Sequence, residues 1–216
     1  MTNEPALPLL DRRRDAGRVR RLFFAGTGFE PALVAKSRDG LKDRLDWVVE
    51  ILTAAKRLGA RFQLDLFGVE RETYAALMPG HSELLDELGD DVIFHGREPH
   101  STLLQSLEQA DFSIFLRKET RTTLAGFPTK YAESIAYGTP VITNAMPSIA
   151  PYHRQGETGF LIDPSDRDRA AAEVVEILAL PGAEIDRMKS ACAAAGLFHY
   201  SNYSDDVRRW LDKLRR

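Results

Sequence analysis

Short apolar runs alternate along this chain with longer segments in which apolar residues recur at helical spacing. Each short run is typical of a buried strand, and each longer segment of a helix with one apolar face. The predicted strands are 21–25, 61–67, 92–95, 112–116, 141–143 and 159–162. The predicted helices cover 103–110, 128–137, 166–178 and 184–194, with one more before the second strand and one at the end of the chain. This alternation predicts an α/β fold, a Rossmann-like parallel sheet with helices on both faces.

The segment 126–143 contains a helix start, a helix stop and a strand. Pro128 suits the first turn of a helix, where a missing N–H costs nothing, and Gly138 ends the helix before the strand. Lys130 falls in the first turn, where the helix dipole disfavours a cation. A bound anion would resolve that conflict, so this helix start is a candidate phosphate site. Glu133 lies one turn further in, between alanines that leave room for a ligand.

The segment between the first two strands has the same feature. Apolar residues recur at helical spacing over 41–55, which predicts an amphipathic crossover helix. Asp39 is its predicted N-cap, and this cap places Lys42 at the third position, where a capping box would hold Glu or Gln. The alternative is a surface lysine paired with Asp46. Because a cation also begins the helix at Lys130, we favour a phosphate-binding role for Lys42.

Parallel strands end at a common edge of the sheet, and ligands bind in the crevice outside that edge. The loops after the first four strands place there Gly26, Thr27, Gly68, Gly96, Arg97 and Arg117. The glycines serve as turn formers or as ligand contacts, with equal weight. The arginines offer several donors to a phosphate, or pair with a nearby acid.

The composition predicts one domain without a general affinity for polyanions. A chain of 216 residues with 44% hydrophobic content can bury one core, which we place at 21–216. Its 29 basic and 32 acidic residues give a net charge of −3, so nucleic acid is not an expected partner. Residues 1–20 are a predicted linker or tail. The basic run within 11–21 can contact phosphates or lipid headgroups, but a solvated tail is the favoured interpretation.

Cysteine content and hydropathy predict a cytoplasmic protein, with peripheral contact at the inner membrane face as the alternative for the basic run. The single cysteine, Cys192, cannot form an internal disulfide. No apolar stretch has the length of a membrane span, and no apolar region follows the N-terminal arginines as in a signal peptide.

Several familiar sites are disfavoured by the residues themselves. The glycines after the first strand do not complete a dinucleotide fingerprint, because Pro31 stands where a third glycine would be. Asp166 and Asp168 formally spell an acidic metal motif, but they begin a helix, where acids complement the dipole. The five histidines show no metal-ligand spacing. We therefore expect no metal and no cofactor.

The order of the motifs resembles the C-terminal, donor-binding half of family 4 glycosyltransferases, which are retaining enzymes with the two-domain GT-B fold. The resemblance extends from about Arg21 to the C-terminus and is carried by LFFAGTG, KDRLD, LDLFG, VIFHGR, ADFSIFLR, GFPTKYAESIAYGTPVIT and ETGFLIDPSD. The N-terminal half, which holds the acceptor in the family, has no counterpart here.

The resemblance implies roles for individual residues. Lys42 would bind the donor diphosphate, and Glu133 would accept hydrogen bonds from the ribose hydroxyls as the second acid of a Glu-x7-Glu motif. The first acid is replaced by Ala125, so backbone N–H groups substitute for it or the contact to the transferred sugar is lost. The catalytic residues stay unassigned. The predicted donor-binding residues are Gly26, Thr27, Lys42, Arg97, Arg117, Gly126, Phe127, Pro128, Thr129, Lys130 and Glu133.

The resemblance also implies a function and a partner. The function is retaining transfer of a sugar from a nucleotide-diphosphate donor, in polysaccharide or glycolipid synthesis. The partner is an N-terminal acceptor-binding domain or subunit, which the final helix would meet through Val207, Trp210, Leu211 and Leu214. Two alternatives stay open: a nucleotide-sugar-binding module without turnover, and another GT-B-like enzyme such as a sugar-nucleotide epimerase.

Overall fold

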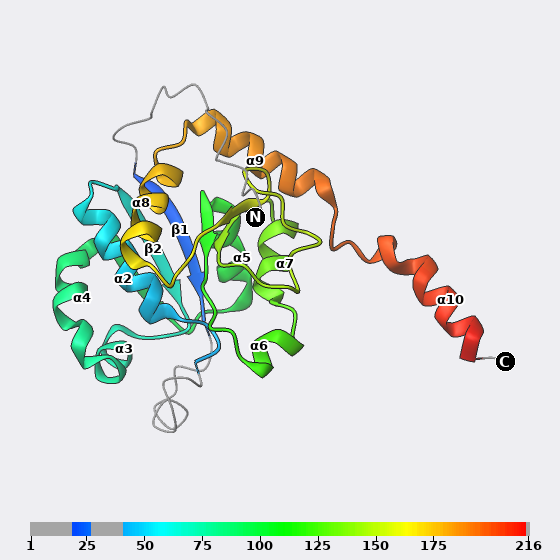
Figure 1. Cartoon of the computed structure of the whole chain (residues 1–216), viewed down its shortest axis with the longest axis horizontal. Coiled ribbons are helices and arrows are strands. Elements are labelled where there is room, and N and C mark those ends of the chain that lie inside the picture. The colour runs from blue at the N-terminus through cyan, green and yellow to red at the C-terminus, as the bar shows by residue number, and fades with distance from the viewer. Residues whose placement is uncertain (1–18, 27–40, 215–216) are drawn as a thin grey trace, which may run out of the picture.

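The structure is a computed structural model and describes residues 19–26 and 41–214. Six strands form one sheet in the order β3-β2-β1-β4-β5-β6, and every neighbouring pair is parallel (Figure 1). The strands are β1 Arg20–Ala25, β2 Phe62–Phe67, β3 Val92–Gly96, β4 Phe112–Ile114, β5 Val141–Thr143 and β6 Gly159–Leu161. The predicted α/β fold with a parallel sheet is therefore confirmed.

Helices connect these strands and cover the sheet. The predicted helices appear as α2 Leu45–Arg57, α5 His100–Gln109, α7 Thr129–Ala136, α8 Arg167–Leu178, α9 Gly182–Ala195 and α10 Ser204–Leu214. Three short helices were not predicted: α3 Arg71–Leu77, α4 Ser82–Leu88 and α6 Arg121–Ala125. Single 3-10 turns lie at Pro79–His81, Gly89–Asp91 and Tyr200–Tyr203. Helices of seven residues or fewer carry too little periodicity to stand out in the sequence, and burial of a few side chains holds them instead.

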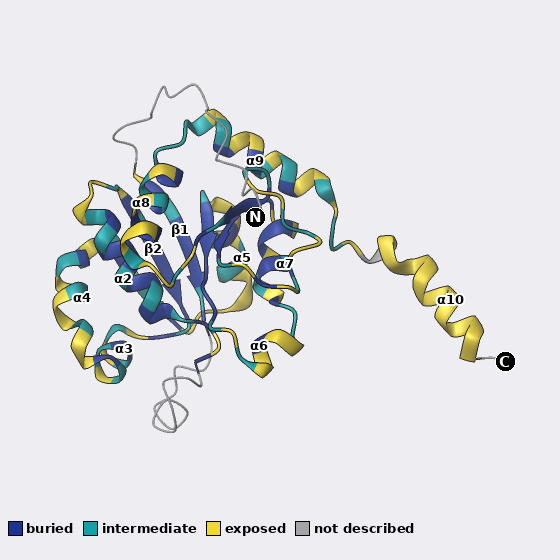
Figure 2. Ribbon diagram, viewed as in Figure 1, coloured by how far each residue is buried: buried dark blue, intermediate teal, exposed yellow. Residues whose placement is uncertain are grey.

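The alternation of side chains in β1 divides the core into two parts. Leu22 and Phe24 are fully buried in the larger cluster, which includes the apolar face of α2. Phe23 points to the opposite face and packs in a smaller cluster with Phe67 and Leu107, from β2 and α5. Helices α2 and α8 pack on each other, and Figure 2 shows that the strands between the helical layers are almost entirely buried.

The first strand begins one residue earlier than predicted, and that residue is buried. Arg20 was assigned to the tail, but its side chain is fully buried and its Nε donates to the carbonyl of Leu178, 3.1 Å away, at the C-terminal end of α8. Its Nη2 donates to the carbonyl of Leu180. The last carbonyls of a helix have no partner within the helix, so an arginine can bind there in the interior.

The last helix lies apart from the sheet. In Figures 1 and 2, α10 extends away from the sheet and its covering helices, and all its residues are exposed. Its apolar residues Val207, Trp210, Leu211 and Leu214 are between 45% and 64% exposed. Among the helices of 41–214, none has the length and apolar content needed to cross a membrane.

Candidate functional site

The site lies where the order of the strands reverses, at the C-terminal ends of β1 and β4. The chain goes from β1 outward to β2 and β3, and then returns to β4 on the other side of β1. Loops at such a reversal leave the edge in opposite directions, which opens a crevice between them. Gly26 follows β1 there, Arg117 follows β4, and α7 begins nearby with Thr129 and Lys130.

Three charged side chains meet at this crevice. Asp43 is 5% exposed, and its Oδ1 accepts a hydrogen bond of 2.8 Å from Nε of Arg117, which is 3% exposed. Its Oδ2 accepts from Nζ of Lys130. Lys130 also lies over the ring of Phe24, with 5.2 Å between Nζ and the ring centroid. The structure thus brings together two predicted phosphate ligands, Arg117 and Lys130, through an acid that the sequence analysis did not assign.

The environment shifts the pKa values of both Asp43 and Lys130. Burial raises the pKa of Asp43, but the neighbouring Lys130 and Arg117 outweigh it and hold that pKa below its usual value. Burial lowers the pKa of Lys130, and the charges of Arg117 and Lys42 lower it further, although Asp43 opposes them. Lys130 and Arg117 therefore repel each other, and the carboxylate of Asp43, which is bound to both, reduces that repulsion.

Lys42 contributes to this cationic cluster from a different position than predicted. Helix α2 begins at Leu45 with Arg44 as its N-cap residue, so Lys42 precedes the helix and is not in its first turn. The predicted cap, Asp39, lies outside the described residues. The alternative pairing with Asp46 is absent as well, because Arg44 donates to both carboxylate oxygens of Asp46. Lys42 is exposed, and its charge acts on Lys130.

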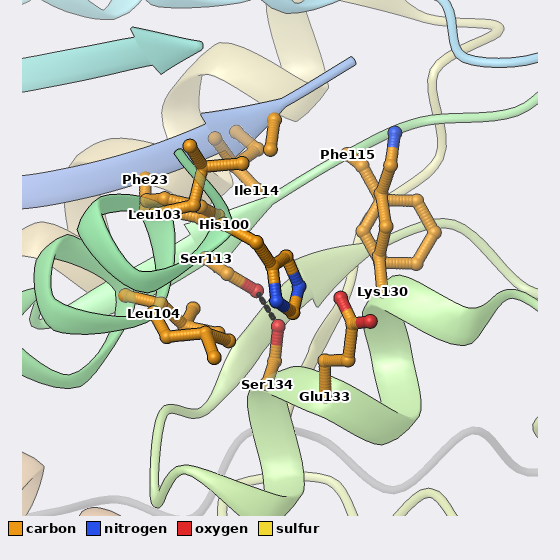
Figure 3. A pocket seen from close by; sticks show the side chains of 12 residues that line it. Phe23, His100, Leu103, Leu104, Ser113, Ile114, Phe115, Lys130, Glu133 and Ser134 are labelled. Atoms are coloured by element: carbon orange, nitrogen blue, oxygen red, sulfur yellow. Dashed lines mark hydrogen bonds between the residues drawn. The ribbon is translucent and has the colours of Figure 1, made fainter. Parts of the chain in front are cut away.

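A pocket opens beside Lys130 between α5, α7 and the strand ends (Figure 3). Its hollow measures about 430 Å³ together with the open space at its mouth. Lys130 and Glu133 project toward it from α7, and His100 enters it from the start of α5. Leu103 and Leu104 form an apolar wall on α5. Apolar walls with a few convergent polar groups are typical of small-molecule sites.

Glu133 is exposed at this pocket, and no hydrogen bond or ion pair joins its carboxylate to another residue within 19–26 or 41–214. Its neighbour Ser134 faces the sheet instead, where its hydroxyl lies 2.8 Å from the hydroxyl of Ser113. Glu133 therefore keeps its full acceptor capacity for a ligand.

The residues before α7 have structural contacts of their own. Phe127 packs in an aromatic cluster with Tyr131, Tyr152 and Phe198, with ring centroids 5.5 to 6.4 Å apart. Pro128, predicted in the first turn, is the buried N-cap residue of α7, and no side chain caps this helix. Two other predicted residues lie beside them: Gly126 is the C-cap residue of α6, and Thr129 is exposed. The N–H of Tyr131 donates to the carbonyl of Pro128 at 2.9 Å, whereas the described residues leave the N–H groups of Thr129 and Lys130 for a ligand or solvent.

Other predicted residues lie farther from the pocket or outside the described residues. Arg97 is exposed beyond β3 and does not line the pocket. Gly26 donates from its N–H to the carbonyl of Phe67, and Thr27 lies outside the described residues. Gly68 meets Gly26 closely, since a Cβ on Gly68 would lie 1.8 Å from the carbonyl oxygen of Gly26. Close backbone packing accounts for this glycine without a ligand.

Sequence reasoning missed Asp43 and His100. Asp43 adjoins Lys42, but an acid beside a lysine before a helix is common on protein surfaces and gave no signal of burial. His100 follows Pro99, the N-cap residue of α5, and was considered only as a metal ligand. Its place at the strand-end crevice, three residues before the apolar wall at Leu103, could have indicated the pocket.

A second, wider hollow is lined in part by Arg117. It measures about 2410 Å³ with its open space and is lined by loops after β4, β5 and β6 and by the start of α8, including Asn144 and Arg167. Asn144 fixes the loop after β4, because its Oδ1 accepts from the N–H of Arg117 at 2.8 Å. Arg117 thus lines this wider hollow, whereas Lys130 lines the pocket beside α5.

Comparisons with known proteins agree with this architecture. Residues 42–194 match the family model described as glycosyl transferases group 1. Among curated proteins, none matches the sequence. A TarM variant from S. aureus, in complex with fondaparinux, alpha-GlcNAc-glycerol and UDP, has a similar structure, with 14% identity and a TM-score of 0.65 over 90% of this chain and 35% of that one.

Two further solved structures are similar. Anabaena HepE in complex with UDP and glucose has 14% identity and a TM-score of 0.65, over 90% of this chain and 48% of that one. Sucrose-phosphate synthase from Thermosynechococcus elongatus has 20% identity and a TM-score of 0.60, over 90% and 45%. At these identities the likeness concerns the fold. This chain spans less than half the length of each of the three.

Proposed function

We propose that this chain, which belongs to the family of group 1 glycosyl transferases, binds the nucleotide-diphosphate part of a sugar donor in the crevice between β1 and β4. In the finer classification we propose a family 4-like enzyme that retains the configuration of the transferred sugar and takes part in polysaccharide or glycolipid synthesis. These finer statements rest on the motif resemblance described above.

The observation that carries the proposal is the convergence of Lys130, Arg117 and Lys42 beside the uncapped start of α7. A diphosphate leaving group carries negative charge, which grows as its bond to the sugar breaks. Fixed cations and helix N–H groups stabilise that charge better in a partly buried crevice than water does. Stabilisation of the leaving group is therefore the proposed contribution of this domain to catalysis.

Glu133 and the apolar wall of the pocket suit the nucleoside. A carboxylate that accepts two neighbouring ribose hydroxyls makes charge-assisted hydrogen bonds, and Glu133 is without a competing partner within the described residues. Leu103, Leu104 and Phe23 line the same pocket and offer an apolar surface to a base. The diphosphate would then extend from Glu133 toward Lys130, one turn earlier in α7.

UDP is the first nucleotide to test. The TarM variant and HepE were both solved with UDP, and both share the fold of this chain. A thermal-shift screen of UDP, GDP, ADP and their sugars measures the binding of each. We expect at least one diphosphate to raise the melting temperature while the matching nucleoside at the same concentration raises it less. No shift with any diphosphate would contradict the proposal.

The acceptor side of the reaction is proposed to belong to an N-terminal domain or subunit. The solved relatives are more than twice as long as the part that this chain matches. The exposed apolar stripe of α10 (Val207, Trp210, Leu211 and Leu214) is the proposed contact surface, since apolar patches of this kind mark interaction sites.

A second candidate function is nucleotide-sugar binding without turnover. The observation that favours it is Ala125, the last residue of α6, which stands where the family has its first acid. Co-expression with a candidate N-terminal half, followed by a transfer assay, distinguishes the two functions. Transfer supports the enzyme, and donor binding without transfer in the assembled protein supports the module.

A further inference from the structure

We propose that Asp43 is a positioning residue, which holds Lys130 and Arg117 in the orientation that a diphosphate requires. This inference rests on the proposed function, because it concerns the same crevice. Asp43 lies before α2, Arg117 follows β4 and Lys130 lies in α7, so one carboxylate joins three separate elements of the chain.

The hydrogen bonds to Asp43 leave donors on both cations for a ligand. Lysine carries three N–H donors and arginine five, and Asp43 accepts one hydrogen bond from Nζ of Lys130 and one from Nε of Arg117. Nη1 of Arg117 is buried and has no hydrogen-bond partner among the described residues. An unpaired donor of a buried arginine is costly, and it shows that Asp43 does not use up the hydrogen-bonding capacity of Arg117. Asp43 therefore orients Lys130 and Arg117 without using all of their hydrogen-bond donors.

The backbone around Asp43 is fixed, as positioning requires. The N–H of Arg44 donates to the carbonyl of Leu116 at 2.8 Å, which joins the segment that carries Asp43 to the segment that carries Arg117. On the other side, Asn144 accepts from the N–H of Arg117 and donates to its carbonyl at 3.1 Å. These backbone hydrogen bonds thus fix the segment that carries Asp43 independently of its bonds to Lys130 and Arg117.

The charge balance distinguishes positioning from competition. Lys42, Arg117 and Lys130 supply three positive charges against the two negative charges of Asp43 and Glu133, so the crevice keeps a positive excess that suits a diphosphate. If Asp43 merely occupied the place of the anion, its removal would strengthen diphosphate binding. If Asp43 positions the cations, its removal lets them move apart by mutual repulsion and weakens binding.

Asp43→Asn tests this difference, since it preserves size and removes charge. Isothermal titration with UDP and with uridine is compared for the wild-type chain, for Asp43→Asn and for the control Asp186→Asn, an exposed position on α9. We expect the Asp43 variant to bind UDP about tenfold more weakly or worse, the loss typical of one charge-assisted hydrogen bond, with uridine within about twofold. UDP binding that is unchanged or tighter would overturn the proposal.

The pH profile gives a readout that a merely structural role would not change. Without the carboxylate, burial and the remaining cations lower the pKa of Lys130 further, so its charge is lost at a lower pH. UDP affinity should therefore fall on the alkaline side at a lower pH in Asp43→Asn than in the wild type. The titratable and charged groups that face Lys130 are Asp43, Arg117, Lys42, Glu133 and His100. Identical alkaline profiles would contradict the inference.

Asp43→Glu keeps the test decisive if the Asn variant does not fold. It retains the charge but moves it by one methylene, so UDP should bind more weakly than to the wild type while the alkaline profile stays close to wild type. Wild-type affinity for UDP in this variant would show that the position of the carboxylate is irrelevant. A wild-type chain that binds no nucleotide overturns the proposed function together with this inference, whereas unaltered binding in both variants overturns this inference alone.

Discussion

A carboxylate with no partner and a carboxylate shared by two cations lie at the same crevice, and their surroundings give them different roles. Glu133 is exposed at the pocket and unpaired within the described residues, whereas Asp43 is 5% exposed and bound to Arg117 and Lys130. An unpaired acid is available to a ligand, and a doubly paired acid is available only to its neighbours. Single substitutions at this scale separate ligand contacts from structural ones.

Glu133→Gln should weaken nucleoside diphosphate binding and leave folding intact. The substitution keeps the shape but removes the charge that strengthens hydrogen bonds from ribose hydroxyls, a loss of about 1.5 to 3 kcal/mol. Calorimetry with the diphosphate measures that loss, and Glu176→Gln, at an exposed position on α8, is the matched control. If the Glu133 variant unfolds while its folded fraction binds normally, the residue is structural.

Lys42→Ala should weaken binding of a diphosphate far more than binding of the free nucleoside. Lys42 is exposed and its charge reaches Lys130, so its loss removes attraction for phosphate while the apolar wall of the pocket is unchanged. The ratio of the two affinities, with Lys213→Ala on α10 as control, measures the effect. An equal loss for nucleoside and diphosphate would show that Lys42 does not contact phosphate.

The sequence indicated that some polar side chains of the crevice lie close together, but it did not indicate the pairing of others. Lys130 and Glu133 lie on one helix, so their spacing alone placed them at one pocket. Asp43 and Arg117 are 74 positions apart in the chain. Their pairing depends on the order of the strands and on where α2 begins, and neither follows from local periodicity.

At the scale of elements, the site depends on how closely the loops after β1 and β2 approach each other. Gly68 has a φ of +94°, and a Cβ there would lie 1.8 Å from the carbonyl oxygen of Gly26. Gly59 has a nearly identical φ of +95°, but a Cβ there would meet nothing within 4 Å. Comparing alanine substitutions at these two glycines therefore distinguishes the cost of backbone strain from the cost of a steric collision.

Gly68→Ala should destabilise the fold more than Gly59→Ala does. Strain at positive φ costs about 1 to 3 kcal/mol and applies to both variants, whereas the collision with Gly26 applies to Gly68→Ala alone. Denaturant unfolding gives the free energy of unfolding for each. Gly68→Ala should also weaken diphosphate binding, since Gly26 lies at the crevice; equal stability of the two variants would mean that the loops are not tightly packed.

Strands were predicted closely because their apolar runs are buried on both faces, and β5 has the predicted bounds. The short helices α3, α4 and α6 were not predicted. Helix α6 has a capping box in which Thr123 takes the place of the usual Glu or Gln, so its start carried no familiar signal. Helices α3 and α4 depend on the burial of Tyr74, Leu85 and Leu88, which only the assembled fold supplies.

At the scale of the molecule, the proposed role of this chain is to supply the donor side of a crevice. The part of the chain that matches covers less than half of each solved relative described above, and α10 presents an exposed apolar stripe. The parallel sheet could be predicted from the alternation of its elements, but the path of α10 could not, because its periodicity predicts an apolar face and not what covers it.

The chain by itself should not transfer sugar to an acceptor at an appreciable rate, even where it binds the donor. Positioning of two reactants can contribute about 7 to 11 kcal/mol to lowering a barrier, and the proposed role of the residues described here concerns the donor alone. A radiolabelled-donor assay on the purified chain tests this, with and without a candidate N-terminal half. Robust transfer by the chain alone would show that it is a complete enzyme.

The central claim is that this domain binds a nucleoside diphosphate through its own cationic crevice. Isothermal titration of the purified wild-type chain with UDP, GDP and ADP tests it most directly, with the matching nucleosides as controls. The account predicts saturable binding of at least one diphosphate, tighter than its nucleoside and weakened by added salt, because exposed charges such as Lys42 are screened. Absence of binding of all three diphosphates at millimolar concentration would contradict it.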